Sequence, residues 1–457
     1  MTMTTQLPGA AIITGPQPWQ VLQREADGCA PVTLAGTWAG DVPSVVEVRV
    51  ASEYDNSPVA GCDWQDAEML ADNGWRITLR VPTGGLYSIE TRVRQNGFEW
   101  RNTGDKIWHV SVGDLWVIAG QSNAVGYGRG PVVDPPAMGV SVFGGNEIWR
   151  MATHPIFDPT GTKYPANRDP GWVGTSPWLA FGKEILQHAG VPVGLIPTAL
   201  GGSPLSAWDP GNPDSAFLYD NMVNMIAAAG GKVAGMVWYQ GCTDTNEELA
   251  PTYLARFTRF VEAFRTQYGA ELPVITAQLN RAPDCQAETD RPWSMVCEAQ
   301  RQAAQCIPNL AVVTTKDLGI SDCVHTNSAG NIILGQRFAR AALGMVYGKN
   351  IPWRTVDLAG ARFENAERTI IRLQFAPVVD HLLFLAARPK DFLVEDADGT
   401  VPINAARVDG TADVVLELAR PAGNGAVCHN MLGCDPVSTL RDHLQRPVLA
   451  FYNVKVE

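Results

Sequence analysis

The stretch DLWVIAGQSNAVGYGRG, residues 114–130, decides the fold because its character changes in the middle. Asp114 to Gly120 is apolar enough for a buried strand, and a small polar quartet ending at Asn123 follows directly. Gly, Ser and Asn often end strands because they tolerate turns and cap helices. In open α/β sheets, the carboxyl end of a parallel strand is also where active sites lie. The stretch therefore predicts a parallel strand and makes Ser122 a candidate for chemistry.

Apolar runs alternate with helical patterns through the middle of the chain. The strand-like runs after Gly120 are VPVGLIPTAL, VAGMVWYQG, LPVITAQLN and LAVVTTKDLG. Between the second and third runs, YLARFTRFVEAFRTQYG carries apolar residues at three- and four-residue steps from Leu254 to Tyr268, which predicts a helix. Strands that alternate with helices predict a parallel sheet with helices on both faces. Right-handed crossovers then place the carboxyl ends of the strands at one edge.

The N-terminal and C-terminal regions of the chain have a different sequence pattern from the middle. Short alternating segments such as SVVEVRVAS, WRITLRVP and HLLFLAARP are separated by turn residues, which is typical of antiparallel β structure. A chain of 457 residues also exceeds one ordinary core. We therefore expect a β-sandwich-like accessory domain over residues 1–110, an α/β catalytic domain over 111–349 and a β-rich domain over 350–457.

The composition of the chain argues against some classes of binding partner. A net charge of −12 argues against nucleic acid or an anionic membrane as the partner. No apolar run is long enough to span a membrane. The N-terminus lacks a basic leader with an apolar core, so we expect a cytoplasmic protein, or a secreted or periplasmic one if a leader has been removed. The nine cysteines show no framework spacing, which favours a reducing compartment. The oligomeric state stays open.

Polar residues follow the other predicted strands, at the same edge as Ser122. The segments are GGSPLSAW after the first run, YQGCTD within and after the second, and ISDCVHTNSAGN after the last. A serine hydroxyl needs a base, histidine suits that work near neutrality, and a carboxylate fixes the imidazole tautomer. Asp322 and His325 lie three residues apart in a predicted turn. We therefore predict a catalytic triad of Ser122, Asp322 and His325.

A tetrahedral intermediate also needs hydrogen-bond donors. The backbone N–H groups of Ser122 and Gly202 and the side-chain amide of Gln240 are the candidates, although Gly201 stays open as an alternative to its neighbour. Aromatic residues that could stack on a sugar are Trp208, Trp172 and Tyr127, against the commoner core role of such rings. The candidate substrate contacts are Gln121, Asn123, Trp208 and Asp244. CHNMLGC, residues 428–434, lacks the paired ligands of a metal site, and we expect no metal and no cofactor.

The blocks GQSN, GG before SPLSAW, WYQG and DCVH together resemble the SGNH/GDSL-type hydrolases, and most of all the sialate O-acetylesterase-like carbohydrate esterases, which include acetylxylan esterases. The resemblance implies a flavodoxin-like three-layer domain with a parallel sheet, Ser122 as nucleophile, no metal, and an acetylated mono-, oligo- or polysaccharide as substrate. One departure is Cys242, where many relatives carry an acid proposed to assist the histidine. Its absence leaves Asp322 to orient the imidazole, with Asp244 as a less favoured substitute.

These observations predict a serine esterase that removes O-acetyl groups from carbohydrates through an acetyl-serine intermediate. Two alternatives stay open. A short-chain lipase or thioesterase of the same fold would use the same residues, although no long apolar lid segment is present to hold a long acyl chain. A non-catalytic carbohydrate-binding protein would not need Ser122, Asp322 and His325 intact.

Overall fold

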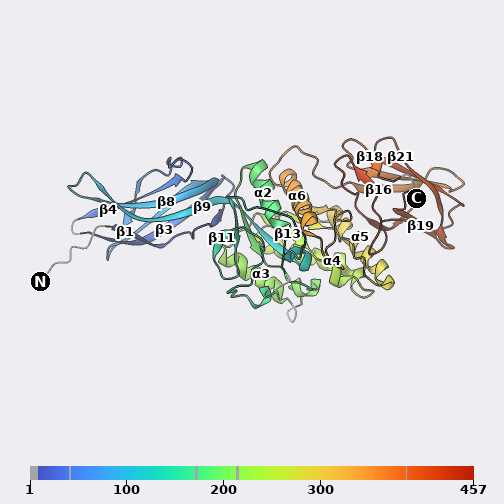
Figure 1. The fold of residues 1–457 in the computed structure, drawn as a ribbon, viewed down its shortest axis with the longest axis horizontal. Coiled ribbons are helices and arrows are strands. Elements are labelled where there is room, and N and C mark those ends of the chain that lie inside the picture. The colour runs from blue at the N-terminus through green and yellow to red at the C-terminus, as the bar shows by residue number, and fades with distance from the viewer. Residues whose placement is uncertain (1–8, 41–42, 170–172, 213–215, 387–388) are drawn as a thin grey trace.

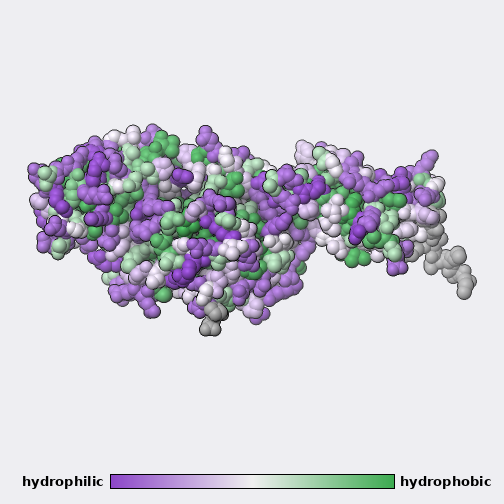
Figure 2. Space-filling model, turned by 180° about the vertical axis from the view of Figure 1, so that it is seen from behind, coloured by the Kyte–Doolittle hydropathy of each residue, from purple (hydrophilic) through white to green (hydrophobic). Residues whose placement is uncertain are grey.

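The computed structural model describes residues 9–40, 43–169, 173–212, 216–386 and 389–457. It is an elongated molecule in which a β-rich N-terminal part, a mixed α/β centre and a β-rich C-terminal part follow one another (Figure 1). The α/β class with β-rich flanks, expected from the sequence, is thereby confirmed. Seen from behind, the surface is mostly hydrophilic, with apolar residues scattered among polar ones (Figure 2). Within the described ranges, no helix is long and apolar enough to cross a membrane.

The N-terminal part consists of two antiparallel layers around a small core. Its strands are β1 (Gly9–Thr14), β2 (Val21–Gln23), β3 (Cys29–Ala39), β4 (Ser44–Ser52), β5 (Gln65–Asp66), β6 (Glu68–Met69), β7 (Gly74–Pro82) and β8 (Gly84–Gln95). One sheet has the order β1-β3-β7-β6, and the other pairs β4 with β5 and β8. The alternating segments of the sequence are strands here because one face of each sheet packs on a core that includes Val48 and Trp75.

Strand β9 (Arg101–Gly120) joins this part to the centre of the molecule. Its first half pairs antiparallel with β8, and its second half lies in the central parallel sheet. Every residue from Val110 to Gly120 is buried, as expected for a strand covered on both faces. The domain boundary expected after residue 110 therefore falls inside one continuous strand.

The central sheet has the order β11-β10-β12-β9-β13-β14-β15. All neighbours are parallel except the edge pair of β10 and β11, so the sheet is mixed. The strands beyond β9 are β10 (Val140–Phe143), β11 (Trp149–Met151), β12 (Val193–Pro197), β13 (Gly235–Tyr239), β14 (Val274–Ala277) and β15 (Leu310–Val313). The chain leaves β9 for β10, β11 and β12 on one side of it and then crosses to β13 on the other side. The strand order therefore reverses at β9, where α/β sheets open a crevice.

Helices cover both faces of this sheet. They are α1 (Ser122–Val125), α2 (Trp178–Ala189), α3 (Phe217–Ala228), α4 (Tyr253–Tyr268), α5 (Asp290–Cys306) and α6 (Ser328–Met345), with short 3₁₀ turns η1 (Pro165–Asn167), η2 (Leu205–Trp208), η3 (Cys242–Asp244), η4 (Ala250–Thr252) and η5 (Ala287–Thr289). Trp116 of β9 packs on α2, which packs on α6. Trp238 of β13 lies opposite Ala119, so its ring points to the other face, against α4. The helix predicted from Leu254 to Tyr268 is confirmed as α4.

The C-terminal part is again antiparallel. Its strands are β16 (Asp357–Phe363), β17 (Ile370–Ala376), β18 (Leu382–Phe384), β19 (Phe392–Asp396), β20 (Gly399–Val401), β21 (Ile403–Asp409), β22 (Asp413–Leu418), β23 (Val427–Asn430), β24 (Leu440–Asp442) and β25 (Phe451–Lys455). They form sheets of order β16-β17-β22-β21 and β20-β19-β23-β25, plus the pair β18-β24.

The contacts that fasten this part to the centre include buried hydrogen bonds, an ion pair and a disulfide. The amide of Gln278 exchanges two hydrogen bonds of 2.8 Å with the backbone of Ala450. In α5, Arg301 bridges Glu298 and, at 3.0 Å, Asp357 of β16. A disulfide also joins Cys285 to Cys434. This pair departs from the sequence-based expectation of reduced cysteines, because the two partners are 149 residues apart and only the tertiary fold brings them together.

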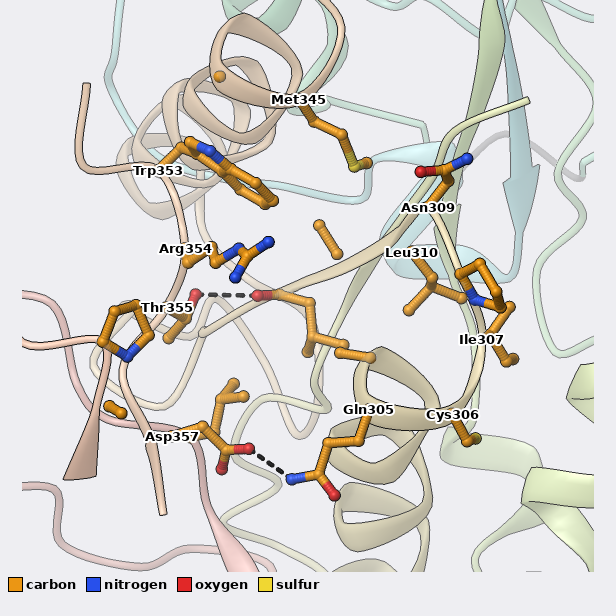
Figure 3. Close-up of a pocket in the computed structure, with 18 residues that line it drawn as sticks. Gln305, Cys306, Ile307, Asn309, Leu310, Met345, Trp353, Arg354, Thr355 and Asp357 are labelled. Carbon is orange, nitrogen blue, oxygen red and sulfur yellow. Dashed lines mark hydrogen bonds between the residues drawn. The ribbon is translucent and has the colours of Figure 1, made fainter. Parts of the chain in front are cut away.

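A cavity of about 560 Å³ lies beneath the amino end of β15, between α5, α6 and the start of the C-terminal part. In Figure 3, Arg354 points into it beside Trp353, and Gln305 donates a hydrogen bond of 2.8 Å to Asp357. Leu310, the first residue of β15, lines the cavity, whereas Ser122 follows the last residues of parallel β9. The cavity is therefore at the end of the sheet away from Ser122.

We predict that Phe260→Ala lowers the free energy of unfolding by about 3–5 kcal/mol, the usual cost of removing a fully buried ring. Phe260 is completely buried and contacts the rings of Trp208 and Trp238. The measurement is urea unfolding followed by tryptophan fluorescence. Phe217→Ala is the matched control, because Phe217 is 52% exposed and its loss should cost little. Equal losses in the two variants would contradict this description of the core.

Candidate active site

Segments that follow β9, β12, β13, β14 and β15 meet at the carboxyl edge of the central sheet and line a pocket of about 480 Å³. Ser122 follows β9, Gly202 follows β12, Thr243 follows β13 and His325 lies beyond β15. The pocket is lined by Gln121, Ser122, Tyr127, Gly202, Cys242, Thr243, Thr245, Ala282, Asp284, Cys285, Thr289, Trp293, Cys323, Val324 and His325. The edge singled out in the sequence thus carries a real concavity, with Ser122 and His325 in its wall.

Ser122, His325 and Asp322 form one chain of hydrogen bonds. Nε2 of His325 lies 2.8 Å from Oγ of Ser122, and Nδ1 of the same ring lies 2.7 Å from Oδ2 of Asp322. Oδ1 of Asp322 accepts the backbone N–H groups of Val324 at 2.9 Å and His325 at 2.8 Å. The carboxylate therefore holds both the ring and the turn that carries it, and the serine oxygen is within reach of an oriented base.

The electrostatics of Asp322 suit this arrangement. Partial burial raises the pKa of its carboxyl group, but the hydrogen bonds from Val324 N–H and from the ring and N–H of His325 outweigh burial and hold that pKa below its usual value. Asp322 therefore stays ionised through the neutral range. Tyr127 stands on the other side of the imidazole, with ring centroids 4.7 Å apart. Burial and a short hydrogen bond to Asp169 raise the pKa of the Tyr127 phenol, so it remains protonated.

The loop of His325 is held by two buried asparagines. The side-chain amides of Asn123 and Asn280 both donate to the carbonyl oxygen of Val324, at 3.2 and 2.7 Å. Oδ1 of Asn123 also accepts the N–H of Thr326 at 3.1 Å. Contrary to the expectation of a substrate contact, Asn123 is 2% exposed and its amide is committed to this loop. It positions the histidine relative to the serine next to it in sequence.

Gly201 and Gly202, which the sequence does not separate, differ in the structure. The N–H of Gly201 donates to Oδ2 of Asp169 at 3.0 Å. Gly202 lines the pocket with φ +69°, and among the described residues its N–H meets no acceptor. The N–H of Ser122, at the start of α1, likewise has no acceptor in the described part of the chain. Two unpaired backbone donors thus stand beside the serine hydroxyl.

Gln240 does not reach the pocket, contrary to expectation. The residue is completely buried, and its amide nitrogen donates to the carbonyl of Ser203 at 3.2 Å and to Asp244 at 2.6 Å. Its Oε1 accepts the phenol of Tyr253 at 3.0 Å. Both amide hydrogens are therefore in use beneath the loop that carries Gly202.

Asp244 also faces the interior rather than a substrate. It is completely buried, pairs with Arg256 at 2.7 Å, and accepts the N–H of Leu205 at 2.9 Å. Trp208 is equally buried, edge-on to Trp238, so it is a core ring and not a sugar platform. Gln121 does line the pocket, with Oε1 accepting the N–H of Gly241 at 2.9 Å. Trp172 lies outside the described residues.

Several residues of the site carry no signal in the sequence. Asp169 holds both Tyr127 and Gly201, yet it stands in a long irregular segment with no motif. Asp284 and Trp293 line the pocket from the segment that follows β14. Asn280 ends the run LPVITAQLN, and its position after a parallel strand is the one cue that could have identified it.

Cys285 contributes to the pocket wall through its disulfide with Cys434. Among the described residues, Cys285, Asp290 and Cys434 form the one group of three side chains spaced closely enough to hold a metal ion. Because the two sulfurs of this group are bonded to each other, they are not free thiolate ligands.

Comparison with known proteins identifies the family of this chain. The model of the family described as carbohydrate esterase, sialic acid-specific acetylesterase, matches residues 112–344, just over half of the chain. A probable carbohydrate esterase from Arabidopsis thaliana is 25% identical over 252 residues, which cover 50% of this chain and 90% of that protein. The crystal structure of a carbohydrate acetylesterase from Xanthomonas citri matches with a TM-score of 0.65 at 21% identity, over 96% of this chain and 99% of that one. The chain therefore belongs to the sialic acid-specific acetylesterase family of carbohydrate esterases and is a carboxylic ester hydrolase.

Proposed function

We propose that the protein is a serine esterase that removes O-acetyl groups from carbohydrates through an acetyl-serine intermediate. The observation that carries this proposal is the hydrogen-bonded chain from Ser122 through His325 to Asp322, with distances of 2.8 and 2.7 Å. Membership of an acetylesterase family supports the acetyl group and the sugar as parts of the substrate.

In the proposed mechanism, His325 takes the proton of Ser122 as the hydroxyl attacks the acetyl carbonyl. The sugar oxygen then leaves with that proton, and a water molecule, deprotonated by the same imidazole, releases acetate. Asp322 keeps Nδ1 protonated and stabilises the imidazolium. We assign the developing oxyanion to the N–H groups of Ser122 and Gly202, because both are unpaired beside the nucleophile. Gln240 supports the glycine loop from below.

For the catalytic domain we propose the flavodoxin-like three-layer fold of SGNH hydrolases, over residues 111–349. The order β12-β9-β13-β14-β15 supports it, since it is the 2-1-3-4-5 order of that fold with β10 and β11 added at one edge. We propose accessory domains over residues 1–110 and 350–457, with β9 crossing the first boundary.

The proposed activity is tested by measuring acetate released from acetylated xylan, O-acetylated sialic acids and acetylated amino sugars. Hydrolysis of 4-nitrophenyl acetate against the butyrate and octanoate esters distinguishes the remaining functions. A preference for octanoate would favour a lipase or thioesterase, and no hydrolysis of any ester would favour a binding protein.

We predict that Ser122→Ala abolishes turnover of acetyl esters and leaves the fold intact, because the Ser122 hydroxyl is the nucleophile hydrogen-bonded to Nε2 of His325. Loss of one triad member typically costs several orders of magnitude in kcat. The measurement is steady-state hydrolysis of 4-nitrophenyl acetate, with circular dichroism as the check on folding. Near wild-type activity in the alanine variant would remove Ser122 from the mechanism.

Asp322→Asn should lower kcat by about 10³ to 10⁴, since an amide at this position favours the wrong imidazole tautomer. Asp244→Asn is the contrasting variant. It leaves Arg256 without its buried partner and should lower the free energy of unfolding by about 3 kcal/mol, with a much smaller effect on kcat. Kinetics and urea unfolding of both variants check the pair. The reverse ranking in kcat would transfer the orienting role to Asp244.

Activity should fall in acid, because the mechanism needs a neutral His325 imidazole to accept the proton of Ser122 and an ionised Asp322 to hold that ring. The hydrogen bonds to Asp322 hold its pKa below the usual value, so this carboxylate keeps its charge to a lower pH than an ordinary aspartate does. The check is kcat/KM against pH, repeated with EDTA. Activity lost to the chelator and restored by zinc or manganese would contradict the serine mechanism, whatever the pH profile.

A further inference from the structure

The wall of the active-site pocket carries an unbalanced negative charge. Asp284 is the one carboxylate that lines the described pocket, and no lysine or arginine lines it. Asp284 is exposed, and among the described residues its carboxylate has neither a hydrogen-bond nor an ion-pair partner. A ligand in this pocket therefore meets an acid whose charge no neighbouring side chain neutralises.

Two cations that belong to or contact the segment after β14 make their interactions outside the pocket. Arg281 pairs with Asp435 at 2.9 Å and reaches the carbonyl of Leu318. Lys316 is 1% exposed, with Nζ donating to the carbonyl of Asn280 behind Trp293. Neither side chain lines the pocket, so neither is placed to receive a carboxylate of the substrate.

The position of Asp284 is fixed by the attachments on either side of it. The N–H of Ala282 donates to the carbonyl of Cys434 at 2.8 Å, and Cys285 is bonded to the same residue through the disulfide. A short segment held at both ends cannot swing its carboxylate far from the pocket. The charge is thus a lasting feature of the wall.

We propose that Asp284 is a specificity-determining residue that selects acetylated sugars which are neutral or cationic near the acetyl group and disfavours sugars that carry a carboxylate there. This inference rests on the proposed esterase activity. Two like charges within one partly exposed pocket repel by an amount equivalent to about a tenfold change in kcat/KM. Despite the family's description, the negative charge of this wall thus favours xylan-type or amino-sugar substrates over free sialates.

The test compares two esters that differ in one charge: the methyl glycoside of an O-acetylated sialic acid and its carboxylate methyl ester. We expect the wild-type enzyme to favour the methyl ester by about tenfold in kcat/KM, and salt to shrink that ratio by screening. Asp284→Asn should bring the ratio close to one. Glu288→Gln is the matched control, because Glu288 is an exposed acid of the same segment that does not line the pocket, and it should keep the wild-type ratio.

If neither sugar ester is turned over, 4-acetoxybenzoate and its methyl ester give the same comparison on a smaller acetyl ester. A wild-type preference for the carboxylate-bearing ester, or a ratio that Asp284→Asn leaves unchanged, would overturn the role of Asp284 while the esterase function stands. No hydrolysis of any of the four esters would instead overturn the proposed function, and the inference with it.

Discussion

The parallel pairing of β9 with β12 on one side and β13 on the other is the constraint on which the site depends. Backbone hydrogen bonds fix the three strands in register, so their carboxyl ends finish at one level. Because the chain leaves β9 toward β10 and β12 on one side and leaves β13 toward β14 on the other, the loops there spread apart and leave room for a ligand. Ser122 and His325, 203 residues apart in the sequence, come within one hydrogen bond for this reason.

Beneath the reactive groups lies a layer of buried amides and acids that is as polar as the site itself. Asn123 and Asn280 share the carbonyl of Val324, and Gln240 and Asp244 tie the glycine loop to Arg256. Each would be costly to bury without these partners. These buried polar residues at the strand ends do not contact substrate. They hold the loops that carry Ser122, Gly202 and His325, and so maintain the short distances between those residues.

The strands, α4 and the position of Ser122 could be predicted from the sequence. The signals for them, apolar periodicity and turn residues, lie in short continuous segments. The hydrogen-bonded arrangement of Ser122, His325 and Asp322 follows the same local signals, because Asp322 and His325 share a turn and parallel strands share an edge. Whether a motif residue faces the core or the pocket depends on contacts with residues that are distant in the sequence. The expectations for Gln240 and Asp244 were wrong for this reason. Trp208 is a core ring because α4 covers it, and the pairing of Cys285 with Cys434 depends on how the C-terminal part docks.

The length of β9 has a consequence for how the molecule transmits movement. A strand of 20 residues that belongs to two sheets leaves no linker between the N-terminal part and the catalytic centre. Bending the N-terminal part relative to the central part would break hydrogen bonds between β9 and its neighbouring strands. The two parts therefore move as one rigid unit and not as domains joined by a flexible linker. The orientation of the N-terminal part relative to the pocket is therefore set by the twist of a single strand.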